Sequence, residues 1–252
     1  MRALWLALCL LCIAGPAFAV DRVVSLNLCT DQMLVLLAPE KVAALSPLAR
    51  DPAISYVASD AARLPVVRAS AEAVLRLHPD LVVAAPYGAQ TTLALLAQEQ
   101  VPILRISLPD DFAAIRRMTR QFAQALGVPE RGEALLAGMD ATLAGVKRPD
   151  HDMRALAWEP RGFTEGPGTF MDAVLHAAGM SNASDGRRVG LEALLRRPPD
   201  MLVVPATPDW PSLATALLQH PALAGLPRRM IPPALTICAG PFSAEAAAML
   251  AR

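Results

Sequence analysis

The sequence has no excess of charge of either sign and none of the common catalytic motifs. Its 252 residues carry 23 Lys and Arg against 23 Asp and Glu, without a basic run. The sequence therefore shows no concentration of positive charge that would bind nucleic acid. Beyond residue 19 there is no Gly-x-Ser-x-Gly elbow, phosphate loop, HExxH or CxxC. His78, His151, His176 and His220 are scattered singly, and lone histidines in such places are more often structural than catalytic. The sequence therefore gives little support to a hydrolase, a nucleotidase or a metal enzyme.

Residues 1–19 have the pattern of a cleavable signal peptide. Arg2 supplies a positive region, an apolar core follows, and Ala17-Phe18-Ala19 matches a signal-peptidase site. An apolar core of about ten residues is too short to span a bilayer. We therefore expect an exported mature chain that begins at Val20.

Cysteine is scarce once this segment is removed, because only Cys29 and Cys238 remain. An oxidising compartment permits the two to pair, although they come from opposite ends of the chain. Two unpaired, buried thiols are the alternative, and the sequence leaves both open.

One short unit occurs twice, at an offset of 120 residues. Residues 71–83 read AEAVLRLHPDLVV, and residues 191–203 read LEALLRRPPDMLV. Each copy has apolar positions at helical spacing, then a proline that ends the helix, then an apolar run typical of a buried parallel strand. Two copies predict two α/β lobes of similar design, with the functional site between them.

The rest of the chain divides around this repeat. We expect an N-terminal α/β lobe at 20–109, a connecting helix at 110–148 and a C-terminal α/β lobe at 149–252. The connecting segment has helical periodicity, no strand signal and an interruption at Gly127-Val128-Pro129. The fold prediction is therefore an α/β protein with two Rossmann-like parallel-sheet lobes joined by a long helical spacer. Residues 46–69 are a long, poorly patterned segment, and such loops are usually functional or wrapped over the surface.

This order of elements resembles the periplasmic binding proteins of iron-siderophore and cobalamin ABC importers. The resemblance rests on the signal peptide, the strand with its Ser25-Leu26-Asn27 turn, the helical spacer and the duplicated Pro-Asp unit, and it covers essentially the whole mature chain. It implies a periplasmic monomer, without a cofactor of its own, that clasps a metal chelate (ferric siderophore, cobalamin or haem) between its lobes. The chelate is then delivered to an ABC permease with its ATPase. An exported α/β enzyme acting on a small molecule is the alternative, and a receptor that senses without transporting is a third.

The resemblance also implies that one glutamate in each lobe docks on the permease. The repeat places these residues at Glu72 and Glu192. The alternative is local, because an acidic residue in the first turn of a helix is favoured by the helix dipole by roughly 0.3–1 kcal/mol.

The ligand is expected where strand ends face one another across the lobes, because ligands bind at the carboxyl ends of parallel strands. Aromatic residues there offer flat apolar walls, although core packing is the alternative for Trp158. Arg161 either pairs with a carboxylate or phosphate of the ligand or is solvated. No direct metal site is expected, since few side chains beyond Asp31 and Glu159 converge on the cleft. The predicted ligand-binding residues are Asn27, Leu28, Cys29, Thr30, Pro86, Tyr87, Trp158, Glu159, Arg161, Phe163, Thr207 and Trp210.

Overall fold

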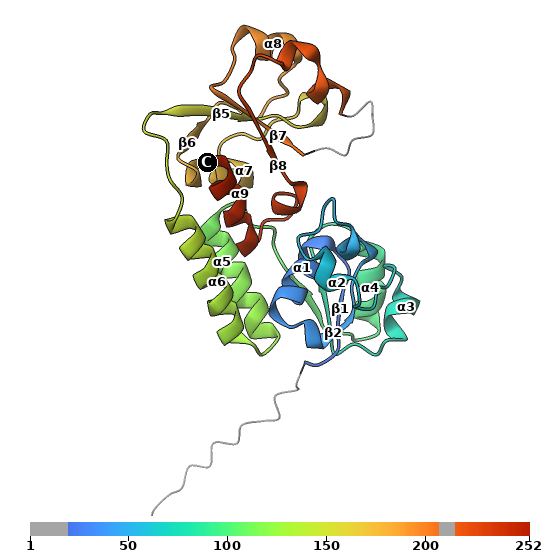
Figure 1. Ribbon diagram of the computed structural model, residues 1–252. Coiled ribbons are helices and arrows are strands. Elements are labelled where there is room, and N and C mark those ends of the chain that lie inside the picture. Colours follow the sequence, from blue (N-terminus) through green and yellow to red (C-terminus); the bar gives the residue numbers. More distant parts are fainter. Residues whose placement is uncertain (1–19, 207–214) are drawn as a thin grey trace, which may run out of the picture.

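The computed structural model describes residues 20–206 and 215–252 (Figure 1). The predicted signal peptide, Thr207 and Trp210 lie outside the described residues. Within the described part, two α/β lobes are joined by a pair of helices. No helix in these two ranges is long and apolar enough to cross a membrane.

The N-terminal lobe is built on a parallel sheet with the strand order β2-β1-β3-β4. Alternate strand residues face opposite sides: Val23 and Val83 pack with α1, whereas Val24 and Val82 pack with α3 and α4. Both faces are therefore covered, as expected of parallel strands. The elements are β1 (Val23–Ser25), α1 (Leu28–Leu37), η1 (Pro39–Lys41), β2 (Val42–Ala44), η2 (Pro47–Arg50), α2 (Ala58–Ala61), α3 (Ala71–Leu75), β3 (Leu81–Ala84), α4 (Gln90–Gln98) and β4 (Ile103–Arg105).

The C-terminal lobe repeats this plan with the strand order β6-β5-β7-β8. Helices α7 and α9 cover one face, and α8 with the short turns before β8 covers the other. The prediction of two parallel-sheet lobes is confirmed, and the duplicated sequence unit supplies α3–β3 in one lobe and α8–β7 in the other. The elements are β5 (Met153–Ala157), η3 (Pro160–Gly162), α7 (Phe170–Ala177), β6 (Met180–Asn182), α8 (Leu191–Arg196), β7 (Met201–Pro205), η4 (Ala216–Gln219), η5 (Pro221–Leu223), β8 (Arg228–Ile231), η6 (Pro233–Leu235), η7 (Pro241–Ser243) and α9 (Ala244–Leu250).

The Pro-Asp pair of the repeat has a structural purpose that the two lobes share. The Asp80 carboxylate accepts hydrogen bonds from the backbone N–H groups of Asp21 and Arg22, at 3.0 and 2.9 Å, just before β1. The Asp200 carboxylate accepts one from Arg154 N at 2.8 Å, on β5. Each aspartate therefore ties the start of its own strand to the start of the neighbouring strand, and so fixes the register of the sheet.

The spacer is a helical hairpin, where the sequence suggested one long connecting helix. Helix α5 (Phe112–Ala125) and helix α6 (Pro129–Ala144) lie side by side (Figure 1), and the Arg120–Glu133 and Arg116–Asp140 ion pairs join them. The chain reverses at Gly127, whose φ of 71° is a conformation that glycine adopts without a Cβ penalty. The interruption predicted at Gly127-Val128-Pro129 is thus a full turn.

Cys29 and Cys238 form a disulfide, so the alternative of two unpaired thiols is wrong. Cys29 lies on α1 of the N-terminal lobe, and Cys238 follows η6 of the C-terminal lobe, 209 residues later. The bridge therefore joins the two lobes covalently.

Candidate functional site

A pocket of about 510 Å³ opens between the lobes, and we call it the inter-lobe pocket. Its size falls within the roughly 300–1,000 Å³ typical of small-molecule sites. Its lining comes mostly from the segments that follow the carboxyl ends of β5, β7 and β8, with Met171 from α7 and Ile54 from the N-terminal lobe. These segments contribute Glu159, Pro160, Glu165, Pro205, Ala206, Pro233, Thr236 and Ile237.

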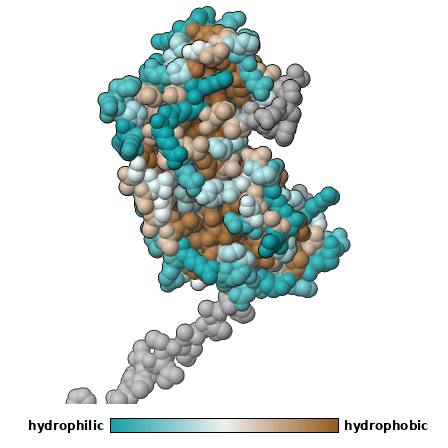
Figure 2. Space-filling model, in the orientation of Figure 1, coloured by the Kyte–Doolittle hydropathy of each residue, from teal (hydrophilic) through white to brown (hydrophobic). Residues whose placement is uncertain are grey.

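Large apolar side chains are left in contact with solvent after strands of both sheets. Tyr87 follows β3 and is 74 % exposed, Leu108 follows β4 and is 46 % exposed, and Phe163 follows β5 and is 53 % exposed. Ile237, in the inter-lobe pocket, is 52 % exposed. Figure 2 shows hydrophobic residues reaching the surface on both lobes, among hydrophilic ones. Exposed apolar groups gathered at one edge typically mark a binding surface.

Two carboxyl groups face this apolar pocket. Burial raises the pKa of Glu159 above its ordinary value, and the nearby charge of Glu165 raises it further. Glu165 Oε2 also accepts a weak hydrogen bond from Met171 N at 3.4 Å. Among the described residues that line the pocket there is no lysine or arginine. The pocket therefore presents carboxyl groups, and no basic side chain from its described lining, to a ligand.

A basic and aromatic rim adjoins the pocket, with Arg161 and Phe163 from the β5–α7 loop and Arg188 from the segment between β6 and α8. The Arg188 guanidinium carbon lies 5.1 Å from the centre of the Phe163 ring, a cation–π distance. Arg188 also donates to the Arg161 carbonyl oxygen at 2.6 and 3.2 Å. Arg161 has a φ of 62° and its side chain is exposed. This rim offers a flat apolar face beside positive charge.

Comparison with known proteins places this geometry in a family. The model of the family described as "Periplasmic binding protein" matches residues 23–227, most of the chain. The chain belongs to the periplasmic binding protein family.

Solved structures of similar fold cover almost all of this periplasmic binding protein. The heme-binding protein RhuT from Roseiflexus sp. RS-1 has a TM-score of 0.72 and 26 % identity, over 92 % of this chain and 97 % of that chain. A possible iron-binding protein from Staphylococcus epidermidis has a TM-score of 0.73 and 15 % identity, over 92 % and 98 %. A periplasmic heme-binding protein from Pseudomonas aeruginosa has a TM-score of 0.71 and 24 % identity, over 92 % and 91 %. Among curated protein sequences, none matches.

Four of the predicted ligand residues serve the fold of this binding protein. Asn27 caps α1 by accepting from Cys29 N at 2.9 Å, and Thr30 is buried against Ser25. Leu28 is buried in the core of the C-terminal lobe. The Cys29 sulfur is bonded to Cys238 in the disulfide. The side chains of Leu28 and Thr30 are buried, and a ligand-binding role for these residues stays a prediction.

Trp158 is also part of the core, where it packs among side chains of its own lobe. It is completely buried with Leu156, Leu194 and Leu202, and its indole Nε1 donates to the Val189 carbonyl oxygen at 2.8 Å. Its backbone N–H continues the sheet by donating to Val203 O at 2.8 Å. This packing favours the core-packing alternative for Trp158, and a role as a ligand wall stays a prediction.

The remaining predicted residues that lie within the described ranges are open to solvent or line the pocket. Pro86, Tyr87, Arg161 and Phe163 are exposed after their strands, and Glu159 lines the inter-lobe pocket. Sequence reasoning missed the segment 233–237, which follows β8 and supplies three lining residues. The rule that ligands bind after carboxyl strand ends, applied to β8, would have found it.

The two predicted docking glutamates occupy equivalent places in the two lobes. Glu72 lies in the first turn of α3 and Glu192 in the first turn of α8, and both are exposed. Glu72 forms an ion pair with Arg76 at 2.5 Å, one helical turn further on. Their docking role stays a prediction.

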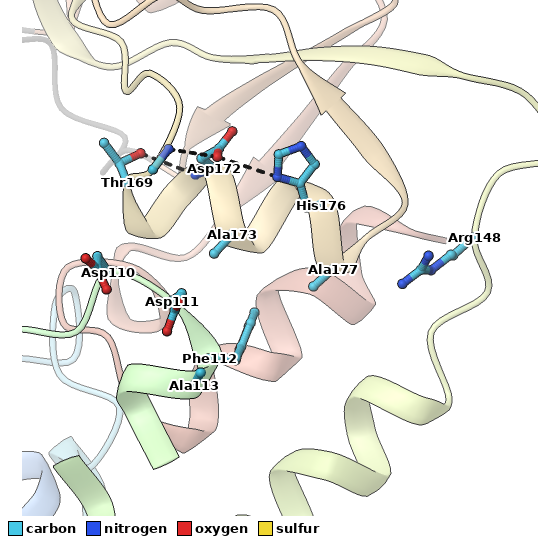
Figure 3. Close-up of a pocket in the computed structure, with 11 residues that line it drawn as sticks. Asp110, Asp111, Phe112, Ala113, Arg148, Thr169, Asp172, Ala173, His176 and Ala177 are labelled. Atoms are coloured by element: carbon cyan, nitrogen blue, oxygen red, sulfur yellow. Dashed lines mark hydrogen bonds and ion pairs between the residues drawn. The ribbon is translucent and has the colours of Figure 1, made fainter. Parts of the chain in front are cut away.

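A second cavity, of about 610 Å³, lies where α7 meets the start of α5 (Figure 3). Asp172 and His176 project from α7, with His176 Nδ1 3.5 Å from Asp172 Oδ2. Arg148 approaches from the segment after α6. The Asp172 carboxylate already accepts from Gly168 N and Asn182 Nδ2, at 3.0 and 2.9 Å. Within residues 20–206 and 215–252, no group of three or more His, Cys, Asp or Glu side chains is arranged to hold a metal ion. This cavity is therefore a weaker candidate than the inter-lobe pocket.

Proposed function

We propose that the protein is the periplasmic solute-binding component of an ABC importer and captures a metal chelate in the inter-lobe pocket. The observation that carries the proposal is an apolar pocket between two lobes, at carboxyl strand ends where bulky apolar side chains are exposed. Membership of the periplasmic binding protein family supports it. The titles of several similar structures, which name heme-binding proteins, support the chelate class.

The chelate is a ferric siderophore, a cobalamin or haem, and each would meet matching chemistry. Phe163 and the exposed Tyr87 offer flat apolar faces to a macrocycle or aryl group. A phenol oxygen is a hard ligand and is one of the groups that hold haem iron, so Tyr87 is the side chain best suited to touch the metal. Carboxylates of the ligand would meet Arg161 and Arg188 on the rim, whereas amide or amine donors would meet Glu159.

Delivery of the chelate to the permease uses two exposed glutamates, one on each lobe. Residues 1–19 direct export and are removed, and the mature chain works as a monomer that binds its cargo and catalyses nothing. Glu72 and Glu192 then contact the permease together, so that docking requires both lobes at their proper spacing. Neither glutamate takes part in binding the chelate.

Titration of the mature chain with haem, cyanocobalamin and a ferric siderophore tests the proposal. One of the three should bind, and Ile237→Asp should weaken it at least about tenfold, because a charge would be buried under the ligand. Tyr87→Ala should weaken it as well. Leu195→Asp is the matched control, since Leu195 is an exposed leucine on α8, outside the pocket. Failure of all three chelates to bind, or equal affinity of Ile237→Asp and wild type, would contradict the proposal.

A further inference from the structure

The two lobes touch each other through side chains that the connecting hairpin does not supply. These contacts join α1 and the segment 51–57 of the N-terminal lobe to the segment 238–245 of the C-terminal lobe. They are formed by residues about 190 to 210 positions apart in the chain.

The disulfide is the contact that most tightly limits separation of the two lobes. Cys29 and Cys238 have Cα atoms 5.2 Å apart, and a disulfide keeps that distance within about 4.4–6.8 Å. While the bridge is intact, the two lobes can separate at this point by no more than about 2 Å. Cys29 lines a small gap together with Ala85 and Ile106 of the N-terminal lobe and Ala239 of the C-terminal lobe, so the bridge lies where the two lobes meet.

The residue next to the bridge reinforces it. Leu28 belongs to α1, yet it is buried among the core side chains of the C-terminal lobe, with Ala155, Met201 and Phe242 in the same cluster. Opening the cleft at this point would expose Leu28 to water, which costs roughly 1.5–3 kcal/mol for a fully buried leucine. The first turn of α1 is therefore shared by the two lobes.

A second contact between the lobes is centred on Tyr56. The Tyr56 ring stacks on Phe242, with ring centres 4.6 Å apart and an angle of 13° between the rings. Tyr56 Oη donates to Glu245 Oε1 at 2.6 Å, and Tyr56 N donates to Gln32 Oε1 at 2.6 Å. Tyr56 is thus held on one side by α1 and on the other by α9 and the turn before it.

We infer that these contacts form a lock between the lobes, with the Cys29–Cys238 bridge as its covalent part and the Tyr56–Phe242–Glu245 clasp as its non-covalent part. The lock, rather than the α5–α6 hairpin, holds the cleft at a fixed width. The oxidation state of the two cysteines thereby sets how freely the lobes move. This inference is independent of which ligand the cleft takes, and even of whether the protein transports.

The inter-lobe distance tests the lock directly. Bioorthogonal nitroxide labels at Glu99, after α4, and at Arg196, on α8, report the separation of the two lobes by double electron–electron resonance without added cysteines. The wild-type chain should give one narrow distribution. The triple variant Cys29→Ser, Cys238→Ser, Tyr56→Ala should give a distribution at least about twofold wider.

Two further arms guard against a variant that fails to fold. Labelled wild-type chain treated with a dithiol reductant loses only the bridge, and Tyr56→Ala with the bridge intact loses only the clasp. Each should widen the distribution by less than the triple variant, while β3 and β7 keep their amide protection. Tyr56→Phe separates the two contacts of the clasp, because it keeps the stacking on Phe242 and removes only the hydrogen bond to Glu245, and it should widen the distribution less than Tyr56→Ala. A wild-type distribution that is already broad would overturn the lock, because the lobes would then not be held at a fixed distance. Variants as narrow as wild type, with protected sheets, would overturn it as well and assign the rigidity to the hairpin.

Discussion

The buried carboxyl of Asp31 should make the stability of the protein depend on pH in a direction opposite to that of most acidic residues. Asp31 lies on α1 and is completely buried. Burial raises its pKa from 3.8 to about 7, although hydrogen bonds from Ser25 and Ser46 act in the other direction. The folded state therefore favours the neutral carboxyl, and the associated stability is complete below about pH 4 and is lost as the pH rises through about 7.

The magnitude follows from this shift. A change from 3.8 to about 7 is about three pKa units, and each unit corresponds to about 1.4 kcal/mol, so the free energy of unfolding should lose up to about 4 kcal/mol from this group. Asp31→Asn removes the titration but keeps an oxygen that accepts from Ser46 N, which lies 3.0 Å away. The variant should therefore equal wild type near pH 4 and exceed it by about 1–4 kcal/mol at pH 8.

Urea unfolding of both proteins, followed by circular dichroism from pH 4 to pH 8, measures the difference. Asp150→Asn, which changes an exposed carboxyl in the segment between α6 and β5, is the matched control and should shift stability little at any pH. If the curves of Asp31→Asn and wild type stay parallel across this range, the neutral buried carboxyl is refuted.

Three further sets of substitutions probe the fold and the docking surface. Asp80→Ala and Asp200→Ala should each lower the free energy of unfolding by about 1–3 kcal/mol, because backbone N–H groups lose their acceptor; urea unfolding that shows no loss would contradict the shared anchoring role. Trp158→Ala should cost about 3–5 kcal/mol of stability, and a variant that kept wild-type stability while losing ligand would return Trp158 to the cleft. Glu72→Lys combined with Glu192→Lys should abolish uptake by cells that lack the native protein, with ligand affinity and Tm unchanged; normal uptake would refute docking.

Local sequence signals predicted much of the architecture because they act over a few residues. Ser70 and Thr169 are residue types that favour helix N-caps, and both side chains accept from backbone N–H groups of the helices α3 and α7. The Pro-Asp units with their apolar runs became equivalent strands in the two lobes, since a covered parallel strand is apolar throughout.

Features that depend on residues far apart in the sequence could not be predicted from it. Trp158 directly follows a strand that is buried on both faces, so no alternation in the sequence tells core from cleft. Cys29 meets Cys238 only because the last turns of the chain pack back against α1. Gly127 marked a break in the spacer, but the direction of the next helix depends on packing between α5 and α6.

The residues of the inter-lobe pocket were likewise predictable from local signals only in part. The rule of carboxyl strand ends pointed correctly to Glu159, but the side chain of each neighbouring residue faced either the core or the cleft according to tertiary packing. Ile54 joined the pocket from residues 46–69, whose expected functional or surface role gave no hint of a contact with the other lobe.

Native mass spectrometry of the protein purified from the periplasm under non-denaturing conditions tests the central claim most directly. We expect one metal chelate bound per chain that begins at Val20, and loss of that mass from the Ile237→Asp variant purified in the same way. A chain that carries only an organic metabolite without metal, or a chelate that Ile237→Asp retains in full, would contradict capture of a metal chelate in the inter-lobe pocket.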